Sequence, residues 1–350
     1  MPETVFPVQG ATLSLAAFSK QPALWKMSVL GVLCFSADAA ASPVQDLDVP
    51  CLRVAMPRLD GADAVSEVWH GSNALTQGRS GALHYGHDDE VLFGVIEVSE
   101  AAFAADAGKT PLQQAAESAY RQVFAVLDTL GFPQVFRFWN YFADINAHSF
   151  GLERYRQFNR GRQDAFMAGG RHEAGIYPAA CALGVAQGPL RVAFLAGRVA
   201  PLNLENPRQI SAYHYPQQYG PRTPMFSRAS VVRLKHAALL FISGTASIVG
   251  HETLHAGDVL AQTGETMANI KAVLAEAHRA AGLAFSLADL NYRVYVRNPG
   301  QLEPIRNALR HCVGAALKAV YLRADVCRQD LLLEIEATAT QSSASAGEAD

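Results

Sequence analysis

The chain has 350 residues, of which 50% are hydrophobic and 17% are charged, as is typical of a soluble globular protein with one large or two ordinary domains. A formal net charge of −3 offers no electrostatic footprint for nucleic acid, so an anion site would need a local cluster of cations. Five cysteines without C-x-x-C or Cys/His spacing indicate reduced thiols in a cytoplasmic protein and no structural zinc.

The first apolar segment, MSVLGVLCFSADAAAS at residues 27–42, ends in an A-x-A pattern that also marks signal-peptide cleavage sites. It follows a segment that contains Pro22 and lacks a basic N-terminal cluster. It is also too short to span a bilayer, which takes roughly 20 apolar residues. We therefore expect a buried strand with its turn, no membrane partner and a cytoplasmic location.

An internal repeat predicts how the chain is organised. Residues 92–99 align without gaps with residues 240–247, and a predicted helix and an aromatic strand follow each segment. The helices are expected at 112–130 and 262–281, and the aromatic strands at 135–141 and 291–296. This pattern predicts two diverged α+β units. Because identities are few, chance similarity between two strand–helix–strand units is the alternative.

Two segments between these units are rich in Arg and aromatic residues. Residues 153–162 hold four Arg with Tyr155 and Phe158 between them, and residues 205–228 combine Pro, Tyr and Arg in one loop. Fixed φ angles, phenol donors and guanidinium forks are the parts needed to hold a small carboxylate ligand. The alternatives are RNA binding by interleaved aromatic and basic residues, and a rigid surface loop whose Arg residues pair with local acids.

The stretch 240–269 combines a strand, a glycine-punctuated turn and a helix start, and we expect the functional site to face it. Small residues at 243–246 would let a ligand approach the backbone, and residues 263–266 offer side-chain oxygens to the first helical turn. Residues 251–255 match H-E-x-x-H, but the flanking glycines leave less than two helical turns. We therefore favour a hairpin loop over a zinc site.

The last predicted strand lies within residues 324–337. Its two-residue period places three apolar side chains on the core face and Glu334 and Glu336 together on the other face. Two carboxyl groups on one face have raised pKa values if a pocket covers them, as a general acid near neutral pH requires; solvated glutamates are the alternative. The small polar residues 338–350 predict a disordered tail.

Residues 240–337 resemble the YjgF/RidA fold, a β-sheet packed by two helices that normally assembles as a trimer. The motifs that carry this resemblance are S-G-T-A, G-D-V-x-x-Q-T-x-x-T-x-x-N-I, V-Y-V-R-N and L-L-x-E-I-E-A. This half of the chain by itself would suggest an enamine/imine deaminase.

Over roughly 135–337 the chain resembles the chorismatases. The motifs are Y-x-x-F-x-x-G-R (155–162), S-A-Y-x-Y-P-x-x-Y-G-P-R (211–222), F-S-R-A (226–229), S-G-T-A-S-I-x-G-H-E-T (243–253) and D-V-C-R-x-D-L-L-x-E-I-E (325–336). The resemblance implies an α+β fold with a RidA/YjgF-like C-terminal domain and an N-terminal part that imitates further RidA-like units, as a pseudo-trimer. We accordingly expect domains at 1–205 and 206–337, a disordered tail at 338–350, and a monomer.

The resemblance also implies a reaction. It is closest to hydroxybenzoate-forming chorismatases, including the bifunctional 3-/4-hydroxybenzoate synthase of xanthomonad-type pigment and ubiquinone pathways. These enzymes remove the enolpyruvyl group of chorismate as pyruvate, without metal or redox cofactor. A protonated Glu334 would protonate the methylene carbon and then stabilise the oxocarbenium ion as a carboxylate. Cys327 would separate aromatic products from a diene diol, with a thiolate accessible near a pH of about 8.5, and lower beside Arg328.

Chorismate is a dianion, so its carboxylates need cations, and small residues would leave room for its ring. The predicted substrate-binding residues are Tyr155, Arg162, Tyr213, Tyr219, Arg222, Arg228, Gly244 and Ala246. The predicted partner is chorismate alone, with no nucleic acid and no membrane. Two other functions stay open at this point: a RidA-like deaminase acting on imines, and a non-catalytic module that binds a small molecule.

Overall fold

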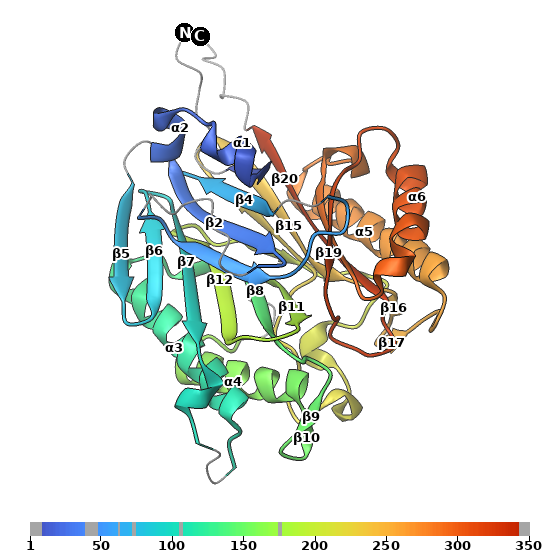
Figure 1. The fold of residues 1–350 in the computed structure, drawn as a ribbon, viewed down its shortest axis with the longest axis horizontal. Helices are drawn as coiled ribbons and strands as arrows, with labels where there is room; N and C mark the ends of the chain where they lie inside the picture. The colour runs from blue at the N-terminus through green and yellow to red at the C-terminus, as the bar shows by residue number, and fades with distance from the viewer. Residues whose placement is uncertain are drawn as a thin grey trace.

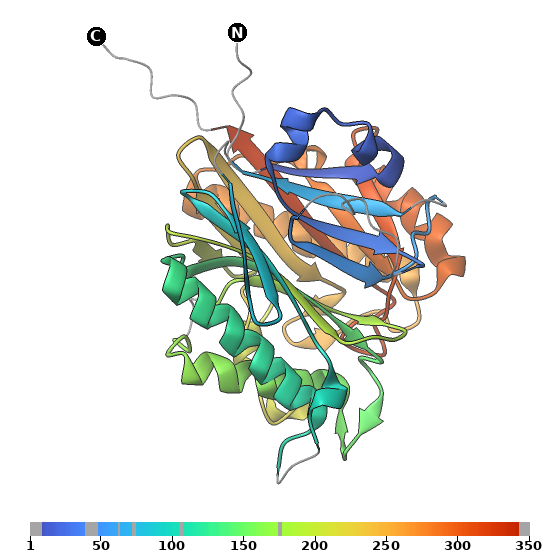
Figure 2. The same cartoon turned by 60° about the vertical axis from the view of Figure 1, so that its left-hand side comes forward.

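Three β-sheets face one another around a shared core, and the longer helices lie on the outside of the molecule (Figure 1; Figure 2). This computed structural model describes residues 9–38, 48–61, 64–71, 75–104, 108–173 and 177–342.

The C-terminal sheet has the order β13-β14-β15-β20-β18-β19, in which β18 and β19 pair in parallel and the other neighbours are antiparallel. Its outer face is covered by helices α5 and α6, seen at the right of Figure 1. The elements are β13 (Leu202–Leu204), β14 (Ala229–Arg233), β15 (Ala237–Thr245), α5 (Val259–Ala281), β18 (Asn291–Val296), α6 (Leu302–Val313), β19 (Lys318–Arg323) and β20 (Leu333–Ser342).

The middle sheet repeats this arrangement strand for strand. Its order is β5-β6-β7-β12-β8-β11, and again only the last pair, β8 and β11, is parallel. The predicted repeat is therefore confirmed. The elements are β5 (Thr76–Ser80), β6 (Leu83–His87), β7 (Val91–Val98), α3 (Pro111–Leu130), β8 (Gln134–Ala143), α4 (Arg154–Ala168), β11 (Ala179–Val185) and β12 (Leu190–Gly197).

The N-terminal sheet is a reduced third copy. Its order, β1-β4-β2-β3, matches the inner strands β7-β12-β8-β11, and its single parallel pair, β2 and β3, is in the corresponding place. The two longer sheets have outer edge strands with no counterpart among the described residues of this sheet. The elements are β1 (Gln9–Ser14), α1 (Leu15–Ser19), α2 (Ala23–Met27), β2 (Val29–Ser36), β3 (Cys51–Ala55) and β4 (Val65–His70).

Three aromatic side chains from equivalent strands meet at the centre of the molecule. The hydroxyl oxygens of Tyr141 on β8 and Tyr295 on β18 are 3.3 Å apart, and the ring centroids of Phe35 on β2 and Tyr141 are 5.8 Å apart. All three side chains are buried in one apolar cluster that draws on every sheet. The predicted fold class is thus confirmed: α+β, with an N-terminal part that imitates the C-terminal unit twice.

Both long helices occur where the periodicity predicts them, but α5 begins earlier than expected. The side chain of Asp258 accepts a hydrogen bond from the N–H of Ala261 at 3.0 Å and caps the helix. Thr263 and Thr266 instead donate to carbonyl oxygens of their own helix, those of Val259 and Gln262. The predicted cap at residues 263–266 is therefore wrong.

The predicted boundaries also need correction. Residues 338–342 continue β20, where small Ala and Thr side chains pair with the long strand β15, so the predicted tail is wrong for these residues; residues 343–350 lie outside the described part. The C-terminal sheet already includes β13, shortly before the expected boundary at 206.

Within the apolar segment 27–42, residues 29–36 form the predicted buried strand, and residues 39–42 lie outside the described part of the chain. Among the described residues, no helix is both long and apolar enough to cross a membrane.

Candidate active site

A cavity of about 330 Å³ opens between the C-terminal unit and the middle unit. One wall consists of β15, β20 and the loop at 326–330, and the other of the start of α4 and the hairpin of β9 (His148–Ser149) and β10 (Leu152–Glu153). The loop at 205–228, with its short 3-10 helices Ala212–His214 and Gln217–Tyr219, forms a third side. The site therefore exists only because two units meet.

Glu334 lies in the wall of this cavity. The residue is 3% exposed, and no described residue forms a hydrogen bond or an ion pair with its carboxyl group. Burial raises the pKa of Glu334 to about 8, the negative charge of Glu336 adds to the rise, and Arg137 opposes it. At neutral pH this side chain is mostly a neutral carboxylic acid that faces an open cavity.

Gly244 makes room for that carboxyl group. The pairing of β15 with β20 shifts register between Ile242 and Thr245, so Gly244 lies in an irregular part of the strand. A Cβ atom added to Gly244 would lie 1.9 Å from Oε1 of Glu334, which is far inside van der Waals contact. Glycine is therefore required at this position, because the carboxyl group of Glu334 packs directly against the backbone of β15. Gly244 and Ala246 both line the cavity.

Glu336 lies on the same face of β20 as Glu334, and it is also 3% exposed. The N-terminal and middle units cover this face, so the alternative of solvated glutamates is excluded. Only one of the two pKa values is raised as predicted. Burial works against ionisation of Glu336, but Arg293 and Arg137 together bring its pKa below the ordinary value. The prediction of two raised pKa values is thus wrong for Glu336.

Three Arg side chains line the cavity. Arg228, 6% exposed, donates hydrogen bonds to the carbonyl oxygen of Ile210 and to the hydroxyl of Tyr215, both at 2.8 Å. The guanidinium of Arg328 lies 4.1 Å from the ring centroid of Tyr219. Its buried NH2 group has no partner in the described part of the chain. The third, Arg156, is paired with the carboxylate of Glu153.

A fourth guanidinium, that of Arg162, lies in a smaller adjoining cavity of about 40 Å³. The two cavities share Glu334 and Cys327 as lining residues. Arg162 is 3% exposed and packs against aromatic rings, and its Nε and NH2 groups have no hydrogen-bond partner among the described residues. Buried N–H groups without an acceptor are costly, so an anionic ligand would find donors already in place.

The H-E-x-x-H residues form the predicted hairpin, from β16 (Ile248–Val249) and β17 (Glu252–Thr253). Nδ1 of His251, in the turn, lies 3.2 Å from the hydroxyl of Tyr219. His255 has a positive φ of 59° and its Nε2 lies 3.6 Å from a carboxylate oxygen of Glu265. The motif therefore lies outside a helix, and its histidines contact different partners.

The chain was compared with known proteins. A family model described as Chorismatase FkbO/Hyg5-like, N-terminal, matches residues 67–196. A 3-hydroxybenzoate synthase of Streptomyces hygroscopicus is 36% identical over 323 residues, covering 88% of this chain and 91% of the relative. A chorismatase of the same organism is 37% identical over 280 residues, with 78% and 79% covered. The crystal structure of a chorismatase superposes with a TM-score of 0.80 at 30% identity, covering 95% of this chain and 98% of that one.

The chain belongs to the chorismatase family. The family predicted from the sequence motifs is therefore confirmed.

Two of the predicted ligand-binding residues lie away from the chorismatase-family cavity. Tyr213 packs against Tyr177, with ring centroids 5.2 Å apart, and Arg222 is exposed. Neither lines the large or the small cavity, because the loop at 205–228 turns twice and directs its side chains to different sides. Tyr155, Tyr219, Arg228, Gly244, Ala246, Cys327 and Glu334 do line the large cavity, and Arg162 lines the small one.

Tyr215 and Arg328 both line the cavity but are not among the predicted substrate-binding residues. Both lie inside motifs that carry the chorismatase resemblance, Tyr215 between two predicted tyrosines and Arg328 directly after Cys327. Their positions inside these motifs were therefore the signal that could have identified them as cavity residues.

Cys327 lies in a loop rather than in the predicted strand, because β20 begins only at Leu333. Arg297 shapes this loop by donating to the carbonyl oxygens of Val326 and Arg328 at 3.1 and 2.9 Å. Burial raises the pKa of Cys327 to about 12; Glu334 adds to this effect and Arg328 opposes it. The expected accessible thiolate is thus wrong, and the side chain faces the cavity as a neutral thiol.

The three equivalent units explain why only one of them carries the acid. Across the sheets, Tyr295 pairs with Glu334, Tyr141 with Arg191, and Phe35 with Val65. The three aromatic residues are equivalent, so their strand partners are equivalent too. Of these three partner positions, the C-terminal one alone holds a carboxyl group.

Proposed function

We propose that this protein is a chorismatase that converts chorismate into pyruvate and 3-hydroxybenzoate, 4-hydroxybenzoate, or both. The observation that carries the proposal is Glu334, a neutral carboxylic acid without a partner at the wall of a cavity lined by cations. The similarity to a 3-hydroxybenzoate synthase and to chorismatases supports the same reaction.

The cations suit a dianionic substrate. Arg228 and Arg328 face the large cavity, and Arg162 faces the adjoining small one with free N–H donors. Guanidinium groups bind carboxylates through charge-assisted hydrogen bonds, and burial strengthens these bonds. Tyr155 and Tyr219 line the same space and would flank the ring.

In the proposed mechanism, Glu334 delivers its proton to the methylene carbon of the enol ether. The π electrons of that double bond form the new C–H bond, and the neighbouring carbon becomes an oxocarbenium ion. Glu334, now a carboxylate, stabilises this cation. The oxygen of water or of the C4 hydroxyl then attacks the cationic carbon, and the Glu334 carboxylate takes back the proton that this oxygen loses. The bond between that carbon and the C3 oxygen of the ring breaks, and the carbon becomes the ketone carbon of pyruvate. Pyruvate and a hydroxybenzoate together contain all the atoms of chorismate, so no redox cofactor is consumed.

The deciding experiment is incubation of the purified protein with chorismate, followed by an enzymatic assay for pyruvate and chromatography of the aromatic products. Stoichiometric release of pyruvate and hydroxybenzoate supports the proposal. Ammonia release from amino-acid-derived imines without turnover of chorismate would point to a RidA-like deaminase. Binding of chorismate without any turnover would point to a non-catalytic module.

Cys327 is proposed to direct the second half of the reaction. To form 3-hydroxybenzoate, the ring must lose its C4 oxygen, and a thiol near the ring can donate a hydrogen bond to that departing oxygen. We expect Cys327→Ala to keep pyruvate release but to shift the other product toward the diene diol or 4-hydroxybenzoate. Cys327→Ser keeps a donor and is the matched control. An unchanged product distribution for Cys327→Ala at an undiminished rate would show that this side chain only packs.

Chelators are expected to leave the activity unchanged, because His251 lies in a hairpin turn and His255 in the loop after it, so they do not share one face of a helix. The measurement is pyruvate release after dialysis against EDTA, beside a determination of zinc in the untreated protein. Stoichiometric zinc, with activity lost on EDTA treatment and restored by zinc, would instead establish a metal site at this motif.

A further inference from the structure

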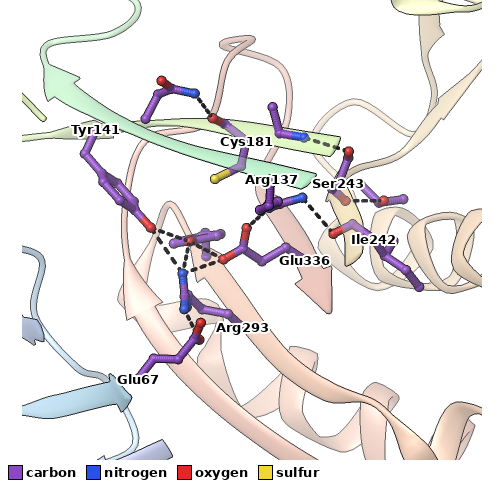
Figure 3. Close-up of polar contacts among 12 residues, drawn as sticks. Glu67, Arg137, Tyr141, Cys181, Ile242, Ser243, Arg293 and Glu336 are labelled. Carbon is purple, nitrogen blue, oxygen red and sulfur yellow. Dashed lines mark hydrogen bonds and ion pairs between the residues drawn. The ribbon is translucent and has the colours of Figure 1, made fainter. Parts of the chain in front are cut away.

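A buried network of charged side chains joins all three units next to the cavity (Figure 3). Arg137 on β8 of the middle unit forms an ion pair with Glu336 on β20. Arg293 on β18 pairs with Glu336 on one side and with Glu67, on β4 of the N-terminal unit, on the other. The network thus contains two carboxylates and two guanidinium groups.

Glu336 is fully satisfied as an anion in this network. Its Oε1 atom accepts hydrogen bonds from Arg293 at 2.6 Å and from the hydroxyl of Tyr295 at 2.8 Å, and its Oε2 atom accepts one from Arg137. Hydrogen bonds to the charged form favour that form, so this carboxylate keeps its charge in a buried place. The pKa of Glu336 is lowered although burial by itself would raise it, in agreement with these contacts.

Arg137 connects the Glu336 carboxylate to β15, the strand against which the Glu334 carboxyl group packs. Its NH1 group donates to the carbonyl oxygen of Ile242 at 3.1 Å, and Ile242 is the last regularly paired residue of β15 before the irregular part that contains Gly244 (Figure 3). Glu336 is therefore held in a defined position relative to the site of the acid.

Glu334 and Glu336 are two residues apart on one strand, so their Cβ atoms project from the same face about 7 Å apart. The Glu336 carboxylate has three charge-assisted or phenolic donors, whereas Glu334 has none in the described chain. Among the described residues, the titratable or charged groups nearest Glu334 are Cys181 on β11, Tyr155 and Arg162 on α4, Cys327 on its loop, Arg137 on β8, and Glu336 itself. The charged groups of Glu153, Arg156, Arg228, Arg328 and Asp330 line the large cavity together with Glu334. Two negative charges so close together in a buried place oppose each other, so the charge stays on Glu336, which has the hydrogen-bond donors.

We infer that Glu336 is a positioning residue for the reaction of Glu334: its charge, held between Arg137 and Arg293, adds to the effect of burial and opposes ionisation of Glu334. This inference rests on the proposed function, in which Glu334 is the proton donor. It assigns to the contact between the three units a second role beside packing, because the units supply the charges that hold Glu336 ionised.

The test is the pH profile of kcat for chorismate, measured for Glu336→Gln and the unaltered protein. The amide removes the negative charge that opposes ionisation of Glu334 and leaves Arg137 and Arg293 without this partner. Both changes favour the anion of Glu334, so its pKa falls. We expect kcat of Glu336→Gln to fall on the alkaline side at a pH about one unit or more lower than for the unaltered protein. Below that pH its activity should be recovered. A rate that falls equally at all pH values, with the alkaline limb of the profile unmoved, would overturn the inference.

Glu67→Gln is the matched control, because it removes a carboxylate from the same network but at the far side of Arg293. Its limb should move much less than that of Glu336→Gln; an equal movement would contradict a specific role for Glu336. Glu336→Asp gives a second test, should Glu336→Gln not fold, because it keeps a negative charge between Arg137 and Arg293. Its limb should stay close to that of the unaltered protein, and a limb that moved down by about one pH unit or more would contradict the inference.

The roles of Glu334 and Glu336 are distinguished by two variants. If Glu334→Gln keeps its turnover, the acid of the proposed function is misassigned. If Glu334→Gln is inactive but the limb of Glu336→Gln stays in place, only the role of Glu336 is wrong.

Discussion

Glu334→Gln is expected to lower kcat for chorismate by at least about 10²-fold while folding and chorismate binding persist. The amide fills the same volume beside Gly244, so the wall of the cavity keeps its shape. It can neither deliver a proton to the methylene carbon nor carry the negative charge that stabilises the oxocarbenium ion. The measurement is the rate of pyruvate release, with chorismate binding followed separately by calorimetry and folding by circular dichroism.

The raised pKa of Glu334 also predicts the direction in which kcat changes with pH. Glu334 acts in its protonated form, and its pKa is raised to about 8, so the active form is present below that pH and is lost as the pH rises through it. We expect kcat of the unaltered protein to fall on the alkaline side of a pH of about 8. Near-normal pyruvate release by Glu334→Gln would place the acid elsewhere; Glu336, the next carboxyl group on the strand, is ionised and paired in this structure.

Gly244→Ala is expected to lower kcat by about 10²-fold as well, because catalytic groups tolerate little displacement. The new Cβ atom would lie 1.9 Å from Oε1 of Glu334 and 3.2 Å from Cβ of Cys181. Glu334 must therefore leave its position, or the two strands must separate. The clashing carboxyl group ends a flexible side chain beside an open cavity, so the free energy of unfolding should fall by less than the cost of overpacking a filled core, which is about 1–3 kcal/mol. Both quantities are measured directly, by pyruvate release and by denaturant unfolding.

Gly264→Ala is the matched control for this substitution. Gly264 lies within α5, has no positive φ, and a Cβ atom there would have open space around it. Alanine is favoured over glycine within a helix by about 0.5–1 kcal/mol, so this variant should be fully active and at least as stable as the unaltered protein. If Gly244→Ala were as active as Gly264→Ala, the close approach of Glu334 to Gly244 would be refuted.

The sequence by itself determined the local elements and the family. Apolar periodicity places α3, α5, β15 and β18 within a few residues, because the period of a helix or strand depends on neighbours along the chain. The same reasoning puts Glu334 and Glu336 on one face of β20. The repeat between the middle and C-terminal units is visible in the residues, and the motifs identify the chorismatase family.

Only the tertiary structure decided which of these residues form the site and in which protonation state. Arg222 and Arg328 are equally basic in the sequence, but the fold exposes the first and turns the second into the cavity. The unlike pKa values of Glu334 and Glu336 arise because both are buried but only Glu336 is paired, with Arg293 and with Arg137, which lies 199 residues earlier in the chain. The Cys327 thiol is kept protonated by burial between two units. Burial and pairing of charges are set by segments far apart in the chain, and local periodicity carries no information about them.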